Sequence, residues 1–183
     1  MKFSQTKLNG AWIIEPEPFH DHRGKFVRLF CRSRLKEILQ GNLIEQVNYS
    51  LTIKTGAVRG MHFQSPPKAE IKLVRCLKGV VFDVMVDLRR RSPTFLQWHG
   101  EILSEENMKM LYVPKGFAHG FQTMQENCEM LYLHTDSYSP QDEAGLRYDE
   151  PMVGIQWPHE VVDISDKDNN FPLLTSEFAG INL

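Results

Sequence analysis

The chain has 183 residues and a formal net charge of −2, with 42% hydrophobic and 24% charged residues. This composition is typical of a globular protein with a hydrophobic core, and the length fits one domain over residues 1–183. The balanced charge gives no reason to expect a nucleic-acid or membrane-surface partner. An anionic ligand would therefore have to be bound by local basic residues.

Three cysteines, Cys31, Cys76 and Cys128, occur at spacings that match neither a CxxC motif nor a zinc site. Cys76 and Cys128 lie within apolar runs, where we expect small buried side chains with reduced thiols. The N-terminal residues lead into no apolar signal region, and no run is long enough to span a bilayer. These features predict a cytoplasmic protein.

Short segments rich in Val, Ile, Leu, Phe and Tyr, broken by Gly, Pro and Asn, follow one another along most of the chain. In chain order the predicted strands are Ala11–Glu15, Gly24–Phe30, Ile44–Thr52, Lys72–Leu77, Val80–Leu88, Phe95–Leu103, Met108–Val113, Gly120–Met124 and Glu129–Thr135. Many short strands with few helices favour a sandwich or a closed barrel.

Few other elements interrupt the strands. One helix is predicted over Ser33–Leu39, with Ser33 as its cap and Gly41 beyond its end. A short helical turn is expected between Asp163 and Asn170. The Lys78-Gly79 pair between two strands indicates a tight hairpin.

Several strands combine polar and apolar side chains on one face. These same-face sets are Lys72, Val74 and Cys76 in one strand, and Met130, Tyr132 and His134 in another. If such faces point into a barrel, the interior is a ligand cavity and not a packed core. The pattern is equally consistent with polar faces that point to solvent.

Two segments carry motifs at a recognisable spacing. Gly56–Gln64, which continues to Glu70, Lys72 and Gly79, and Pro114–Phe121 together resemble the two motifs of the cupin superfamily, whose fold is a jelly-roll barrel. Metal-binding cupins carry His-x-His in the first motif, whereas here the second histidine is replaced by Gln64. His62, Glu70 and His119 are the ligands that would remain, which argues against a transition metal and a metal-dependent oxygenase.

A closer resemblance covers nearly the whole chain. The segments that carry it are Phe19–Phe26, Gln46–Ser50, Arg59–Gln64, Lys72–Arg75, Phe82–Asp87, Ser92–Phe95, Pro114–Phe121, Tyr132, Tyr138–Pro140, Gly154–Pro158 and Ser165–Asp168. In order and spacing they resemble the dTDP-4-dehydrorhamnose 3,5-epimerases. The resemblance implies an all-β cupin jelly roll with a few short helices. It also implies epimerisation at C3, C5 or both of a nucleotide-linked 4-keto-6-deoxyhexose, in deoxysugar or surface-polysaccharide biosynthesis.

The resemblance implies a role for each of four residues. The ketone at C4 makes the neighbouring protons acidic, so the reaction needs a base, a group that stabilises the enolate and an acid, but no redox cofactor. His62 matches the general base and Asp168 the carboxylate that orients it. Lys72 matches the cation beside the enolate oxygen, and Tyr132 matches the acid on the opposite face.

The resemblance also implies a set of substrate-binding residues. These are Arg23 and Arg59 at the diphosphate, Phe26 and Tyr138 around the base, and Gln46, Asn48, Asp83, His119 and Glu143 elsewhere in the cavity. The family is a homodimer with exchanged N-terminal strands, which would bring Arg23, Phe26 and Arg28 from the partner. The nonpolar Ala11–Ile14 segment is compatible with an interface strand.

Arg28 departs from the family pattern, which usually has a glutamate there, near the edge of the base. A carboxylate accepts the N3–H of thymine, whereas an arginine can only donate, and cytosine offers acceptors at N3 and O2. The substitution predicts either a preference for CDP-linked sugars or an Arg28 side chain that points away. Two further alternatives are an epimerase acting at one carbon only and a catalytically silent cupin that binds sugar nucleotides.

Overall fold

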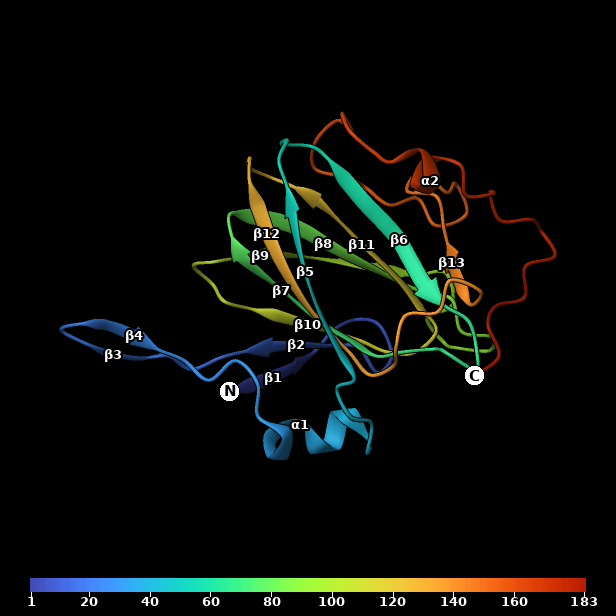
Figure 1. The fold of residues 1–183 in the computed structure, drawn as a ribbon. Helices are drawn as coiled ribbons and strands as arrows, with labels where there is room; N and C mark the ends of the chain where they lie inside the picture. The colour runs from blue at the N-terminus through green and yellow to red at the C-terminus, as the bar shows by residue number, and fades with distance from the viewer.

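The computed structural model describes all 183 residues. Two large antiparallel sheets face each other, and a third sheet has only two strands (Figure 1). The first sheet has the order β1 (Lys2–Gln5), β2 (Trp12–Glu15), β10 (Met110–Val113), β7 (Lys72–Lys78), β12 (Cys128–His134), β5 (Gln46–Thr52). The second has the order β13 (Glu143–Gly145), β6 (Val58–Gln64), β11 (Phe117–Thr123), β8 (Val80–Asp87), β9 (Trp98–Ser104). The prediction of an all-β jelly roll is confirmed.

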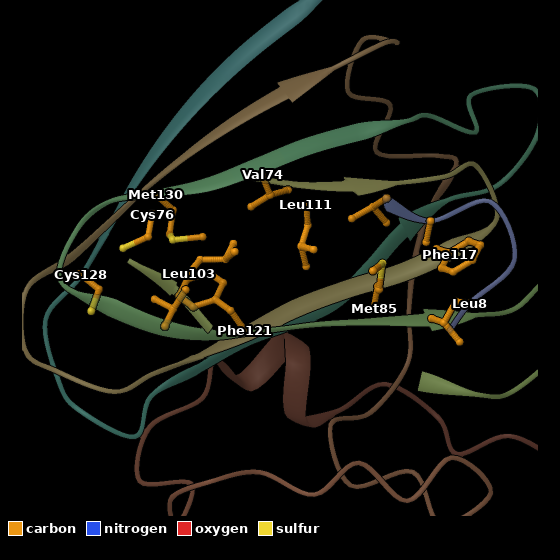
Figure 2. Close-up of a cluster of buried hydrophobic side chains, with 13 residues drawn as sticks. Leu8, Val74, Cys76, Met85, Leu103, Leu111, Phe117, Phe121, Cys128 and Met130 are labelled. Atoms are coloured by element: carbon orange, nitrogen blue, oxygen red, sulfur yellow. The ribbon is translucent and has the colours of Figure 1, made fainter. Parts of the chain in front are cut away.

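At one end of the molecule, buried apolar side chains fill the space between the two sheets (Figure 2). It contains Val74 and Cys76 from β7 and Met130 from β12, as their alternation predicts, together with Met85 and Phe121 from the second sheet. Burying each of the larger side chains contributes roughly 1.5–3 kcal/mol relative to leaving it exposed. This end therefore holds the two sheets together, and the polar members of the same strand faces lie toward the other end.

The predicted hairpin at Lys78-Gly79 is wrong. β7 pairs with β10 and β12 in the first sheet, whereas β8 pairs with β9 and β11 in the second. The turn therefore carries the chain from one sheet to the other and does not join paired neighbours. Gly79 has φ +81°, a backbone conformation that glycine adopts readily because it has no Cβ. A side chain at this position would also collide with Cys128.

The helical predictions are correct in place but differ at their ends. α1 (Arg32–Leu39) begins after Cys31 and not at Ser33, and no side chain caps it. It ends with Gln40 in the left-handed conformation, one residue before Gly41. α2 (Asp166–Asn169) is the expected short turn, capped by the Ser165 side chain.

Several strands begin or end at other residues than predicted, and four strands are not predicted as such. The Gly24–Phe30 strand shortens to β4 (Gly24–Phe26), which forms a hairpin with β3 (Phe19–Asp21). β1, β3, β6 and β13 are the unpredicted strands. The glycine and polar residues of β6 obscure its strand pattern, although its motif is recognisable.

The β3–β4 hairpin projects away from the barrel (Figure 1). Its Phe19 and Phe26 side chains are 66% and 76% exposed. The outward face of β5 is also apolar and exposed, at Val47, Tyr49 and Leu51. Neither of the two helices has the length and apolar composition of a membrane-spanning segment.

Candidate active site

A cavity of about 820 Å³ lies at the polar end of the barrel. Strands β5, β6, β7, β11 and β12 contribute to its wall, and the segment from Asp163 to Asp168 closes one side. Seven of the fourteen predicted site residues line it: Asn48, Arg59, His62, Lys72, His119, Tyr132 and Asp168. Its volume suits a ligand the size of a sugar nucleotide.

His62 and Asp168 form the closest polar pair in the cavity. His62 Nε2 lies 2.7 Å from Asp168 Oδ1, and the backbone N–H of Gly60 donates to Asp168 Oδ2 at 3.0 Å. Burial alone would raise the pKa of Asp168, but the His62 bond and these hydrogen bonds outweigh it and hold the pKa below its usual value. The carboxylate is thus ionised and orients a partly exposed imidazole, which is the arrangement of a histidine base.

Lys72 lies on the floor of the same cavity and is almost fully buried. Its ammonium donates to the carbonyl oxygen of His62 at 3.1 Å and lies 3.5 Å from Glu70 Oε1. Burial lowers the pKa of Lys72, and the Glu70 charge acts in the opposite direction. A cation in a buried site that excludes water stabilises negative charge on a bound molecule far more strongly than a cation in bulk water does.

Tyr132 reaches the cavity from β12. Its hydroxyl lies 3.0 Å from Ser50 Oγ, and its ring meets that of His119 edge to face. Burial raises the pKa of Tyr132 far above its usual value. The phenol therefore holds its proton at neutral pH, as a proton donor must.

His119 and Asp83 form a second histidine–carboxylate pair. His119 Nε2 lies 2.8 Å from Asp83 Oδ1, while Asp83 Oδ2 is buried with no hydrogen-bond partner. Asp83 is completely buried behind His119 and does not line the cavity. It is therefore placed to orient His119, which favours an indirect role over direct contact with a substrate.

The predicted residues Gln46, Tyr138 and Glu143 surround the rim and do not line the cavity. The Tyr138 hydroxyl and Lys167 Nζ both donate to Glu143, at 2.7 and 2.6 Å. Gln46 accepts the backbone N–H of Tyr138 at 3.0 Å. Burial would raise the pKa of Glu143, but Lys167 and Tyr138 hold it below its usual range.

Arg59 and Arg23 occupy very different surroundings. Arg59 lines the cavity and donates to Thr52 Oγ1 at 2.8 Å. Arg23 is bound only to Asp21 on the exposed β3–β4 hairpin, and Phe26 and Arg28 are exposed as well. These three residues do not reach the cavity of their own chain.

Sequence reasoning missed several polar residues of the site, and four of them bear on its chemistry. Ser50, Lys167 and His134 line the cavity, and Glu70 binds both His134 and Lys72. His134 shares a strand face with Tyr132, so its position is visible in the alternation. The cupin motif points to Glu70 only as a metal ligand.

Gln64 has a structural role in the strand that carries His62. Its amide donates to the carbonyl oxygens of Lys68 and Ser137 and accepts the backbone N–H of Ser139. The other residues considered as metal ligands are bound to separate partners: His62 to Asp168, Glu70 to His134, and His119 to Asp83.

Comparison with known proteins gives a consistent family. Residues 5–176 match the family model described as dTDP-4-dehydrorhamnose 3,5-epimerase. A protein of that name from Methanothermobacter thermautotrophicus is 43% identical over 93% of this chain and 92% of its own. The crystal structure of the Legionella pneumophila epimerase, in complex with dTDP-4-keto-L-rhamnose, superposes with a TM-score of 0.91 at 38% identity, covering 100% of this chain and 98% of that chain.

The crystal structure of an enzyme with a narrower reaction is also similar to this chain. The 3'-monoepimerase from Streptomyces bikiniensis, in complex with dTDP-quinovose, has a TM-score of 0.85 at 30% identity. The match covers 92% of this chain and 85% of that chain. The same barrel therefore occurs in an enzyme that acts at a single carbon.

Proposed function

The chain belongs to the dTDP-4-dehydrorhamnose 3,5-epimerase family, and we propose that it inverts C3, C5 or both of a nucleotide-linked 4-keto-6-deoxyhexose. The observation that carries this proposal is the His62–Asp168 pair at 2.7 Å, in one cavity with Lys72 and Tyr132. A base, a cation and a weak acid are the groups that proton transfer next to a ketone requires. The reaction moves protons only, so it consumes no oxidant or reductant.

In the proposed reaction His62 removes a proton from the carbon beside the ketone. The Asp168 carboxylate stabilises the imidazolium that results and keeps the ring in place. The electron pair moves into an enolate whose oxygen carries negative charge. The Lys72 ammonium, held by the His62 carbonyl oxygen, stabilises that charge.

Tyr132 then returns a proton to the opposite face of the same carbon, which completes the inversion. Its high pKa means that the phenol is fully protonated before this step. Ser50, 3.0 Å away, can donate to the phenolate oxygen that remains. His119, oriented by Asp83, is proposed to bind the sugar beside Tyr132.

We further propose that the protein works as a homodimer in which the β3–β4 hairpin reaches the cavity of the partner. Two observations support this. Arg23 and Phe26 are exposed on a hairpin that projects from the barrel (Figure 1), and the exposed Arg28 follows directly after it. In addition, Val47, Tyr49 and Leu51 of β5 are exposed apolar side chains. In this arrangement Arg23 joins Arg59 at the diphosphate, and Phe26 and Tyr138 enclose the base. The three unpaired cysteines fit a reducing compartment such as the cytoplasm.

Proton NMR in deuterated water tests the reaction. The protein is mixed with dTDP-linked or CDP-linked 4-keto-6-deoxyglucose, and deuterium at C3 and C5 is followed with time. We expect enzyme-dependent label at both carbons. Label at one carbon alone would indicate a single-centre epimerase, and intact binding with no label on either substrate would leave a silent binding protein.

The same experiment decides which nucleotide is preferred. If Arg28 contacts the base, the CDP-linked sugar should be labelled faster, because arginine donates to the acceptors of cytosine. If Arg28 points away, the dTDP-linked sugar should be labelled faster. Arg28→Glu is the matched variant, and it should shift the preference toward dTDP only in the first case.

A further inference from the structure

A row of polar side chains connects Lys72 to the rim, and its other members have no role in the proposed reaction steps. His134 Nδ1 lies 2.8 Å from Glu70 Oε2, and Glu70 Oε1 lies 3.5 Å from Lys72 Nζ. On the other side, His134 Nε2 lies 3.4 Å from Asn48 Nδ2, and Asn48 Oδ1 accepts from Gln46 Nε2 at 3.0 Å. The row thus runs from Gln46 to Lys72.

The direction of every hydrogen bond in this row follows from one backbone group. The N–H of Tyr138 can only donate, so the Gln46 atom facing it is an oxygen and its amide nitrogen faces Asn48. Asn48 therefore accepts from Gln46 with its oxygen and donates to His134 with its nitrogen. Because His134 Nε2 receives this donor, its proton is on Nδ1 and is donated to Glu70.

Glu70 is consequently held as an acceptor between two donors. Its side chain is 7% exposed and that of His134 is 12% exposed, so neither interaction competes strongly with water. Glu70 is also the group nearest to Lys72 that carries the opposite charge, and it opposes the effect of burial on the Lys72 pKa. A substitution of His134 would therefore change the position of the Glu70 carboxylate beside Lys72, although His134 and Lys72 do not bind each other.

We propose that His134 and Glu70 are positioning residues for Lys72: His134 aims the Glu70 carboxylate at the ammonium and thereby keeps Lys72 charged and in place for the enolate. The inference rests on the proposed function, in which Lys72 stabilises that enolate. It adds two residues that act on the reaction by way of Lys72. The rings of Tyr132 and His134 are stacked with their centroids 6.2 Å apart, and this packing restrains the plane of the imidazole.

The dependence of kcat on pH tests the proposal in the full-length protein at saturating substrate. Glu70→Gln keeps the shape of the side chain but removes the charge, so Lys72 should lose its proton at lower pH than in the wild type. We expect the alkaline limb of the kcat profile to move to lower pH, with kcat about tenfold or more below wild type at alkaline pH and KM little changed.

Two substitutions of His134 separate positioning from packing. His134→Asn can still donate an N–H to Glu70 and should keep the wild-type profile, whereas His134→Leu cannot and should resemble Glu70→Gln. Glu101→Gln is the matched control. Glu101 lies on β9, outside the cavity, and its Oε1 is 2.6 Å from Lys109 Nζ. A profile in Glu70→Gln and His134→Leu that falls in height without moving would reduce both residues to packing and overturn the proposal.

A measurement without turnover tests the hydrogen-bond directions themselves. Long-range ¹H–¹⁵N NMR of the histidine rings should show His134 neutral, with its proton on Nδ1. A proton on Nε2 would overturn the proposal even if the protein is an epimerase. Absence of deuterium exchange by the wild type would instead overturn the proposed function, and the role of Lys72 with it, so the two failures are distinguishable.

Discussion

The side chains that the proposed reaction uses are each held in place by neighbouring polar groups. His62 is held by Asp168 and Tyr132 by Ser50, while Lys72 is bound between the His62 carbonyl oxygen and Glu70. The proposed base and the proposed acid therefore keep fixed orientations, and both line the cavity. Substitutions of these residues should separate the two halves of the reaction.

Tyr132→Phe should leave proton removal by His62 intact but abolish return of a proton from the other face. We expect deuterium to enter the substrate with retention of configuration, while the rate of inversion falls by about 10²–10⁴. The measurement is NMR of the recovered sugar, with label and configuration read separately. Loss of label together with inversion would show that Tyr132 is needed for proton removal too.

Asp83→Asn should make the protein more stable and less active. Asp83 is completely buried with one unpartnered oxygen, and burial raises its pKa. A carboxyl whose pKa is higher in the folded state binds more protons there, so folding stability falls as pH rises through that range. We expect Asp83→Asn to gain about 1 kcal/mol at neutral pH and progressively less in acid.

Urea unfolding of Asp83→Asn and the wild type at several pH values provides the check. Activity should fall because His119 loses the carboxylate that orients it. A variant that is less stable than wild type at neutral pH would contradict this account and would mean that the buried charge is well compensated by His119.

At the scale of elements, the site depends on the close approach of β6 and β11. A Cβ at Gly120 would lie 2.7 Å from the Arg59 carbonyl oxygen, and one at Gly60 would lie 2.6 Å from Gly120 Cα. The pairing of these strands sets His62 beside His119 in register. The Gly60 N–H also donates to Asp168, so the strand contact and the His62–Asp168 pair share one backbone segment.

Gly120→Ala should push β6 away from β11 and thereby disturb both packing and catalysis. We expect a loss of about 1–3 kcal/mol in the free energy of unfolding, which is typical of overpacked sites. The activity of the remaining folded protein should also fall, because Asp168 moves relative to His62. Thermal or urea melts with parallel deuterium-exchange assays would detect both effects, and a variant with wild-type values for both would mean that the strands can part freely.

At the scale of the whole molecule, the proposed dimer makes the cavity a shared site. Leu51 of β5 and Ile53, directly after the end of this strand, are exposed in addition to Val47 and Tyr49. Contiguous exposed apolar side chains of this kind are usual at protein–protein interfaces. The β3–β4 hairpin would then bring Arg23 and Phe26 to the rim of the partner's cavity. Within their own chain these residues do not reach the cavity.

Leu51→Lys combined with Ile53→Lys should give a monomer that binds the nucleotide diphosphate weakly, because Arg23 and Phe26 would no longer reach it. Analytical ultracentrifugation and a titration with dTDP measure the two effects. Ile102→Lys, an exposed apolar position on β9, is the control and should leave both unchanged. A double variant that remains dimeric would exclude this face as the interface.

The sequence by itself determined the fold class, most strands and the family. Strand propensity and turn residues are local properties, and the family motifs are contiguous, so both can be read along the chain. For the same reason the motifs alone single out His62, Lys72, Tyr132 and Asp168. Their roles remain predictions.

Only the tertiary structure decided which of these segments meet. The turn at Gly79 has the same local chemistry whether it joins paired strands or crosses between sheets, and the choice depends on long-range pairing. Glu70 and His134 are 64 residues apart, and their hydrogen bond exists because β7 and β12 pair with His134 opposite Lys72. Contacts of this kind follow from strand register, which no local pattern encodes.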